Sequence, residues 1–158
     1  MNEHHSLKTA YTFFLGLLLA IFVGVGVQAF YSQPKFPEYP TYGYTEKPTV
    51  EEKKAQEEFD KKVKEHDEQS KPYHRNVSLI TMGAAIVFLA VGVLFDKKLK
   101  IIANGFMIGG ILTLIYSIGR SFAADNLKYT FAAVSAGLVI AFALGYWQFL
   151  RPKPAKKK

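Results

Sequence analysis

The chain of 158 residues has no cysteine, and its four long apolar runs contain neither an acidic residue nor a proline. The first absence excludes disulfides, thiolate zinc sites and iron–sulfur ligation. The second removes the intramembrane carboxylates and broken helices that commonly mark coupled transport. Redox chemistry at thiols and a carboxylate relay within these runs are therefore excluded.

The common catalytic motifs are also missing. The chain contains no Gly-Lys-Ser/Thr phosphate-binding loop, no Gly-x-Ser-x-Gly nucleophile turn and no histidine–carboxylate cluster. His4 and His5 have no further ligand nearby, and Pro72 lies between His66 and His74, so we assign neither pair to a metal. We predict a non-catalytic protein with no cofactor and no metal.

The sequence does contain four runs long enough to cross a bilayer. Ile101 to Gly119 is uncharged over nineteen residues and ends at Arg120. As a helix it would measure roughly 28 Å, close to the hydrocarbon thickness of a bilayer. The predicted transmembrane helices are residues 11–31, 77–95, 101–120 and 129–150. The fold class we predict is all-α integral membrane: a four-transmembrane-helix bundle with one extracytoplasmic charged helix between the first and second spans.

The first apolar run has a second interpretation, as a cleaved signal peptide. Lys8 would supply the positive start, residues 13–27 the apolar core, and Val27-Gln28-Ala29 a cleavage site. This apolar core is at the long end for a signal peptide, so we favour an uncleaved signal anchor. The spans downstream are the same in either case.

The polar region between the first two spans has two parts. Residues 32–48 alternate prolines with aromatic residues, which favours an extended path. Residues 49–71 are rich in Glu, Lys and Gln and should form a helix that begins with a capping box, Thr49 with Glu52, and ends at Pro72. The side chains that we expect to meet a partner are Tyr39, Tyr42, Tyr44, Phe59 and Val63.

Small residues recur every fourth position in three of the spans. Steps of four keep residues on one side of a helix, and small residues let neighbouring backbones approach each other. We therefore predict helix packing at these positions rather than chemistry. They are Gly16, Ala20 and Gly24 in the first span, Gly105, Gly109 and Thr113 in the third, and Ala133, Gly137, Ala141 and Gly145 in the fourth.

A single arginine stands at the edge of the third predicted span. We interpret Arg120 as a side chain that reaches headgroups or water, with Asp125, five residues further on, as a partner for its guanidinium. In the alternative interpretation Arg120 lines the outer mouth of a transport path.

Basic residues beside the spans predict the orientation. Lys97, Lys98 and Lys100 lie in a short loop, and residues 151–158 form a basic tail, so the positive-inside rule places the tails 1–10 and 151–158 in the cytoplasm. We base the orientation on these short segments because they lie directly beside the spans. A raw count over all segments gives eleven basic residues outside and nine inside. We expect a multi-pass protein of the cell membrane whose C-terminal tail meets anionic lipid headgroups, and no nucleic-acid partner.

These observations favour an interaction protein. We expect a scaffold, assembly or accessory subunit that presents the Pro/Tyr-rich segment and the charged helix to a membrane-protein partner or to a second copy of the chain. The alternative is a small oligomeric transporter or channel with Arg120 at its outer mouth. Solute flux through liposomes distinguishes the two.

Overall fold

The computed structural model describes residues 3–40 and 49–147, and the regular structure of these residues is entirely helical. Four helices follow one another along them: α1 (Glu3–Phe30), α2 (Val50–Phe95), α3 (Lys100–Phe122) and α4 (Leu127–Gly145). All four are long and apolar enough to cross a membrane. The predicted all-helical bundle with four candidate spans is confirmed at this level.

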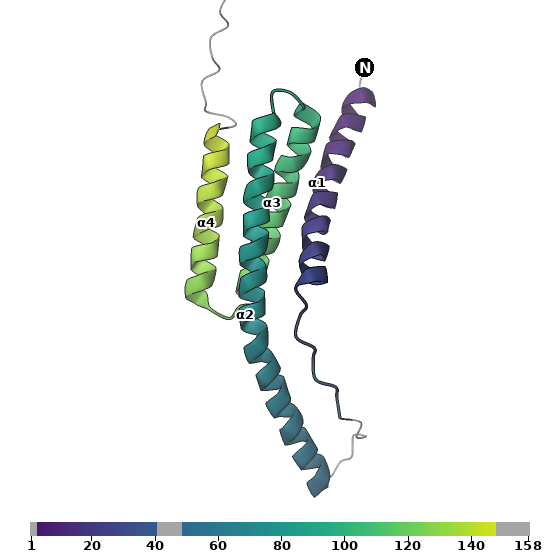
Figure 1. Cartoon of the computed structure of the whole chain (residues 1–158), viewed down its shortest axis with the longest axis vertical. Helices are drawn as coiled ribbons and strands as arrows, with labels where there is room; N and C mark the ends of the chain where they lie inside the picture. Colours follow the sequence, from purple (N-terminus) through teal and green to yellow (C-terminus); the bar gives the residue numbers. More distant parts are fainter. Residues whose placement is uncertain (1–2, 41–48, 148–158) are drawn as a thin grey trace, which may run out of the picture.

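The central helix of the bundle is α3. It packs most extensively against α2, then against α1, and only sparsely against α4. Successive helices are antiparallel, so the start of α1, the α2–α3 turn and the end of α4 lie at one end, the upper end in Figure 1. We call it the lysine end, after Lys8, Lys97, Lys98 and Lys100. The opposite end, from which α2 projects, is the arm end.

The charged helix and the second span form one helix, which differs from the prediction that Pro72 ends the first. The helix α2 continues through Pro72, and its charged half projects beyond the other helices and slants towards the side of α1 (Figure 1). An internal proline removes one hydrogen bond and crowds the carbonyl four residues earlier, here that of Glu68, which is exposed. Tyr73 and Val77, directly beyond the proline, are only 4% and 0% exposed. Their burial offsets the local cost.

The other helix boundaries differ from prediction by up to eight residues. Residues 3–10, predicted as a tail, belong to α1 because nothing in them breaks a helix. The helix α4 begins at Leu127 because the Asn126 side chain caps it, accepting a hydrogen bond from the Tyr129 backbone N–H at 3.1 Å. The end of the fourth predicted span, residues 148–150, and the predicted basic tail, residues 151–158, lie outside the described part of the chain.

The close approach of α1 to α3 depends on glycines. A Cβ atom at Gly16 would lie 2.5 Å from Ile108 Cγ2 and 3.0 Å from the backbone nitrogen of Gly109. A Cβ atom at Gly105 would lie 2.6 Å from Leu15 Cδ2. The two backbones can pack this closely because these positions carry no side chain.

A second close contact joins α3 to α2. A Cβ atom at Gly110 would lie 2.5 Å from Leu89 Cγ. Nearer the arm end, Ser78 and Ser117 exchange hydrogen bonds, since each hydroxyl donates to the backbone carbonyl of the other residue, at 2.9 and 2.7 Å. Both serines are fully buried. The exchange satisfies two hydroxyls that water does not reach.

The structure places the predicted packing residues unequally. The positions buried between helices are Gly16, Gly105, Gly109, Thr113, Ala133 and Gly137. The positions that are half-buried or exposed are Ala20, Gly24, Ala141 and Gly145. At Gly24 and Gly145 a Cβ atom would meet nothing within 4 Å. Helices that cross at an angle are in contact over only part of their length, so a regular stripe is used only in part.

Replacing Gly16 by alanine should therefore destabilise the bundle by about 1–3 kcal/mol, because the added methyl group collides with Ile108 and with the backbone of α3. The matched control is Gly24→Ala in the same helix, which should leave the unfolding temperature in mild detergent unchanged or slightly raised. Equal effects of the two substitutions would contradict this packing.

Candidate interaction site

The charged half of α2 begins with the capping box that the sequence predicts. The Glu52 backbone N–H donates to Thr49 Oγ1 at 3.3 Å, and the Thr49 backbone N–H donates to Glu52 Oε2 at 2.6 Å. This start fixes the outer tip of the helix. We use "strip" for residues 32–40 and "arm" for the strip together with residues 50–71.

The strip lies against one face of the charged helix, which carries an apolar stripe made of Ala55, Phe59 and Val63 and continued by His66. The rings of Tyr39 and Phe59 have their centroids 5.1 Å apart, and Phe36 meets His66 edge-on at 5.1 Å. His66 Nε2 lies 3.2 Å from the carbonyl oxygen of Pro34 and donates to it, because a carbonyl can only accept. The His66 side chain is 12% exposed. It therefore holds the strip on the helix.

Two of the predicted partner-facing side chains, Tyr39 and Phe59, thus contact each other. Tyr39 nevertheless remains 74% exposed, whereas Phe59 and Val63 are half-buried. Tyr42 and Tyr44 lie outside the described residues. The strip is therefore held on the helix, while the side chain of Tyr39 stays open to solvent.

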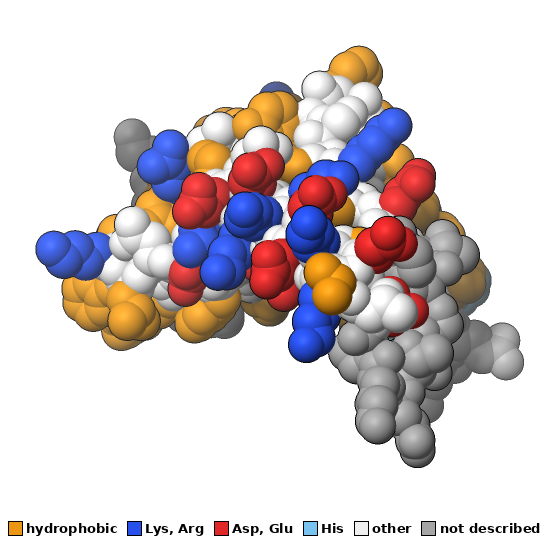
Figure 2. Space-filling view, turned by 90° about the horizontal axis from the view of Figure 1, so that it is seen from below, with side chains coloured by type: hydrophobic (Ala, Val, Ile, Leu, Met, Phe, Trp, Pro, Cys, Tyr) orange, Lys and Arg blue, Asp and Glu red, His pale blue; other side chains and the backbone are white. Residues whose placement is uncertain are grey.

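The remaining arm surface is charged and of mixed sign. Residues 50–71 hold six lysines and eight acidic residues. Figure 2, seen from the arm end, shows the two kinds interspersed, with hydrophobic side chains along the flanks. Charges of both signs therefore alternate over the arm, and neither sign forms a large separate patch on the face shown.

Arg120 lies among aromatic and histidine side chains, at the junction of arm and bundle. Its Nε donates to the Tyr116 hydroxyl at 2.9 Å, and its Nη1 donates to His74 Nδ1 at 2.9 Å. The guanidinium also lies over the rings of Tyr116 and Tyr73, at 5.4 and 5.8 Å from their centroids. We call Arg120, Tyr116, His74 and Tyr73 the arginine cluster.

The predicted partner of Arg120 is engaged elsewhere. Asp125 Oδ2 lies 2.7 Å from Lys71 Nζ, which corrects the expected pair with Arg120. The shared hydrogen bond, and next the attraction of the charges, lower the pKa of Asp125 and raise that of Lys71. Because α2 continues past Pro72, Lys71 is held beside the α3–α4 turn, a neighbour that sequence spacing does not reveal. The exposed pair is weakened by salt.

The neutral form of His74 fits the arginine cluster. Burial lowers the pKa of His74, and the charges of Arg120 and His66 lower it further. A neutral imidazole can accept the hydrogen bond from Arg120 at Nδ1, whereas a protonated one cannot.

Further contacts join the helices where the arm meets the bundle. Tyr31, directly after α1, stacks on Tyr73 with ring centroids 5.3 Å apart and an interplanar angle of 5°. Its hydroxyl accepts a hydrogen bond from Asn76 Nδ2 at 2.9 Å. The Tyr129 hydroxyl of α4 donates to the carbonyl oxygen of Arg75 at 3.1 Å. The helices α1, α3 and α4 are thus all tied to residues 73–76 of α2.

Ring contacts and hydrogen bonds join the described side chains of the arm and of the arginine cluster. Within residues 3–40 and 49–147, no group of three or more His, Asp or Glu is placed to hold a metal ion. Sequence reasoning missed the roles of His66, His74 and Lys71. For His66 a signal existed, because it follows Val63 by three residues and so shares the face of the apolar stripe.

No protein-family model, curated protein or solved structure matches the chain.

The pKa of His74 predicts how stability changes with pH. Because it lies below the ordinary value of 6.5, the unfolded chain takes up a proton first as the pH falls, which favours unfolding. The unfolding temperature should therefore decrease between pH 7 and pH 5, and His74→Gln should reduce the decrease. The Arg120→Gln variant should reduce it in part, since it removes one cause. Parallel curves for wild type and His74→Gln would contradict the assignment.

Removing the ring beneath Tyr39 should release the strip. Loss of one aromatic pair is worth ~1 kcal/mol, so Phe59→Ala should speed tryptic cleavage after Lys35 by about fivefold. The control is Val50→Ala, at a residue of the same helix that is 72% exposed, which should leave the cleavage rate unchanged. Equal cleavage rates in the wild type, Phe59→Ala and Val50→Ala would show that Phe59 does not hold the strip.

Proposed function

We propose that this protein is a non-catalytic, multi-pass scaffold, assembly or accessory subunit of the cell membrane, whose arm presents the strip and the charged helix to a partner outside the cell. The lysine end, with both tails of the chain, then lies in the cytoplasm. The partner is a membrane protein or a second copy of the chain.

Insertion into a bilayer is supported by the apolar side chains on the outside of the bundle. Phe22, Ile115, Phe131 and Phe142 are 61–76% exposed. They belong to three different helices, and many other large apolar residues of the bundle are exposed in the same way. A monomeric protein in water rarely exposes apolar surface on this scale, whereas lipid covers it without cost.

The observation that carries the proposal is the continuity of α2 from arm to span. Residues 50–72 extend up to roughly 33 Å at the rise of an α-helix. The base of this extension is held against the bundle by the arginine cluster, with the exposed Lys71–Asp125 pair beside it. A partner that binds the tip is therefore held at a set distance and direction from the membrane, which is the task of a scaffold.

The state of Arg120 favours the scaffold over the channel. Its guanidinium bonds to Tyr116 and His74 and is covered by two rings. An arginine held in this way braces the base of the arm. Flux of an ion through liposomes of purified protein, abolished by Arg120→Ala, would instead support the channel.

Photo-crosslinking in intact cells tests the proposal. Benzoylphenylalanine at Tyr39 or at Lys54, both exposed on the arm, should give one discrete product of higher mass. The control position is Ile115, an exposed apolar residue of α3, where we expect no protein adduct. Absence of any product from the arm, at normal expression, would overturn the scaffold.

A further inference from the structure

An open groove runs between α1 and α3 at the lysine end, far from the arm. Its volume is about 830 Å³, and it is lined by His5, Lys8, Thr9, Thr12 and Phe13 from α1, and by Lys100, Ile101, Asn104, Met107, Ile108 and Ile111 from α3. A volume of this order is typical of sites that hold a small molecule. The hydroxyl of Thr12, one of these residues, donates to the carbonyl oxygens of Lys8 at 2.8 Å and of Ile101 on α3 at 3.5 Å.

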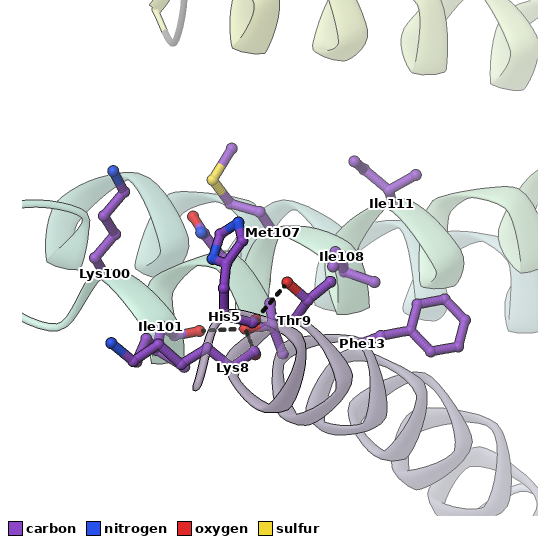
Figure 3. Close-up of a pocket in the computed structure, with 11 residues that line it drawn as sticks. His5, Lys8, Thr9, Phe13, Lys100, Ile101, Met107, Ile108 and Ile111 are labelled. Atoms are coloured by element: carbon purple, nitrogen blue, oxygen red, sulfur yellow. Dashed lines mark hydrogen bonds between the residues drawn. The ribbon is translucent and has the colours of Figure 1, made fainter. Parts of the chain in front are cut away.

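The polarity of the groove changes in the same direction along both helices. On α3 it passes from Lys100 through Asn104 to Ile111, a distance of roughly 16 Å. On α1 it passes from Lys8 to Phe13. Figure 3 shows the two lysines at one end, and Phe13 and Ile111 at the other. Along the groove, cationic groups are followed by amide and hydroxyl groups and then by hydrocarbon. A phospholipid carries complementary groups in the same order: phosphate, then esters, then acyl chain.

Charge at the mouth of the groove selects the headgroup. Lys8 and Lys100 are exposed and come from two different helices. Both also line a second groove of about 740 Å³, together with Lys98 and apolar residues that include Leu7. The side chain of Asp96 also lies at this end, and it lines neither groove. Among the described residues that line the groove, a phosphate at the mouth would therefore meet Lys8 and Lys100 and no carboxylate.

We propose that the groove between α1 and α3 binds one anionic phospholipid, with its phosphate between Lys8 and Lys100 and an acyl chain along Phe13, Ile108 and Ile111. The lipid lies along the same two helices that the contacts at Gly16 and Gly105 hold together. This inference rests on the proposed insertion into a membrane, but it does not depend on the arm or its partner.

Lipid titration followed by native mass spectrometry tests the site. Purified, delipidated protein in mild detergent should bind one phosphatidylglycerol more tightly than phosphatidylcholine of the same chain length. The double substitution Lys8→Gln with Lys100→Gln should weaken phosphatidylglycerol binding by roughly ten- to thirtyfold, from the typical attraction of two surface lysines to anionic lipid. The matched control is Lys53→Gln with Lys54→Gln on the arm, which makes the same charge change and should leave binding unchanged.

Two further variants separate the groove from general surface charge. Thr9→Trp fills the first groove without altering its lysines and should abolish the bound lipid, whereas Leu7→Trp lies in the second groove and should not. The same spectra report the unfolding state and oligomeric mass of each variant. Glycerol phosphate should not displace the lipid.

Several results would overturn the proposal. Equal affinity for the two lipids, or unchanged binding by the folded double lysine variant, would contradict it. So would displacement of the lipid by glycerol phosphate alone. A protein dimer that forms instead of a lipid adduct, and that Thr9→Trp dissociates, would also contradict it. None of them bears on crosslinking at the arm, so the groove and the scaffold stand or fall separately.

Discussion

Backbone contact between α3 and its two main neighbours is the constraint on which the rest of the structure depends. Apolar side chains gain little by leaving lipid for one another, so helices in a bilayer associate through close packing and hydrogen bonds. Gly109 faces α1 and Gly110 faces α2. Adjacent residues of a helix point about 100° apart, so two consecutive glycines make α3 thin on two sides. This explains why α3 occupies the centre.

The features proposed to be functional follow from that packing. Because α2 is fixed along α3 by Gly110 and by the exchange between Ser78 and Ser117, its charged half leaves the bundle in a defined direction. The arginine cluster then braces the point of exit. On the other side of α3, the groove lies along the contact with α1 and is lined by residues of both helices. Both the arm and the groove therefore involve helices that pack directly on α3.

Much of the fold could be predicted from the sequence, because apolar runs bounded by charges and a capping box are local signals. The four candidate spans and the cap at Thr49 were of this kind. The continuation through Pro72 was not, since it depends on the burial of Tyr73 and Val77 by other helices. Propensity near a proline weighs only local costs, whereas the outcome includes tertiary packing.

The candidate site was harder to predict than the helices. Spacing suggested Asp125 for Arg120, yet the pairs that form, Arg120 with His74 and Lys71 with Asp125, join residues about fifty positions apart. The stripe of small residues likewise predicted contacts along whole helices, but crossing helices use only part of it, so Gly16 is buried and Gly24 is not. Periodicity identifies a face, and only the arrangement of the helices decides which part of that face is used.

The central claim is that these helices thread a membrane, with the arm on the outer side and the lysine end on the inner side. Since the chain has no cysteine, single-cysteine variants labelled by a membrane-impermeant maleimide measure this directly. The account predicts that Lys54→Cys is labelled in intact cells and Lys98→Cys only after the membrane is permeabilised. Labelling of both from the same side, or protein that remains soluble without detergent, would contradict it.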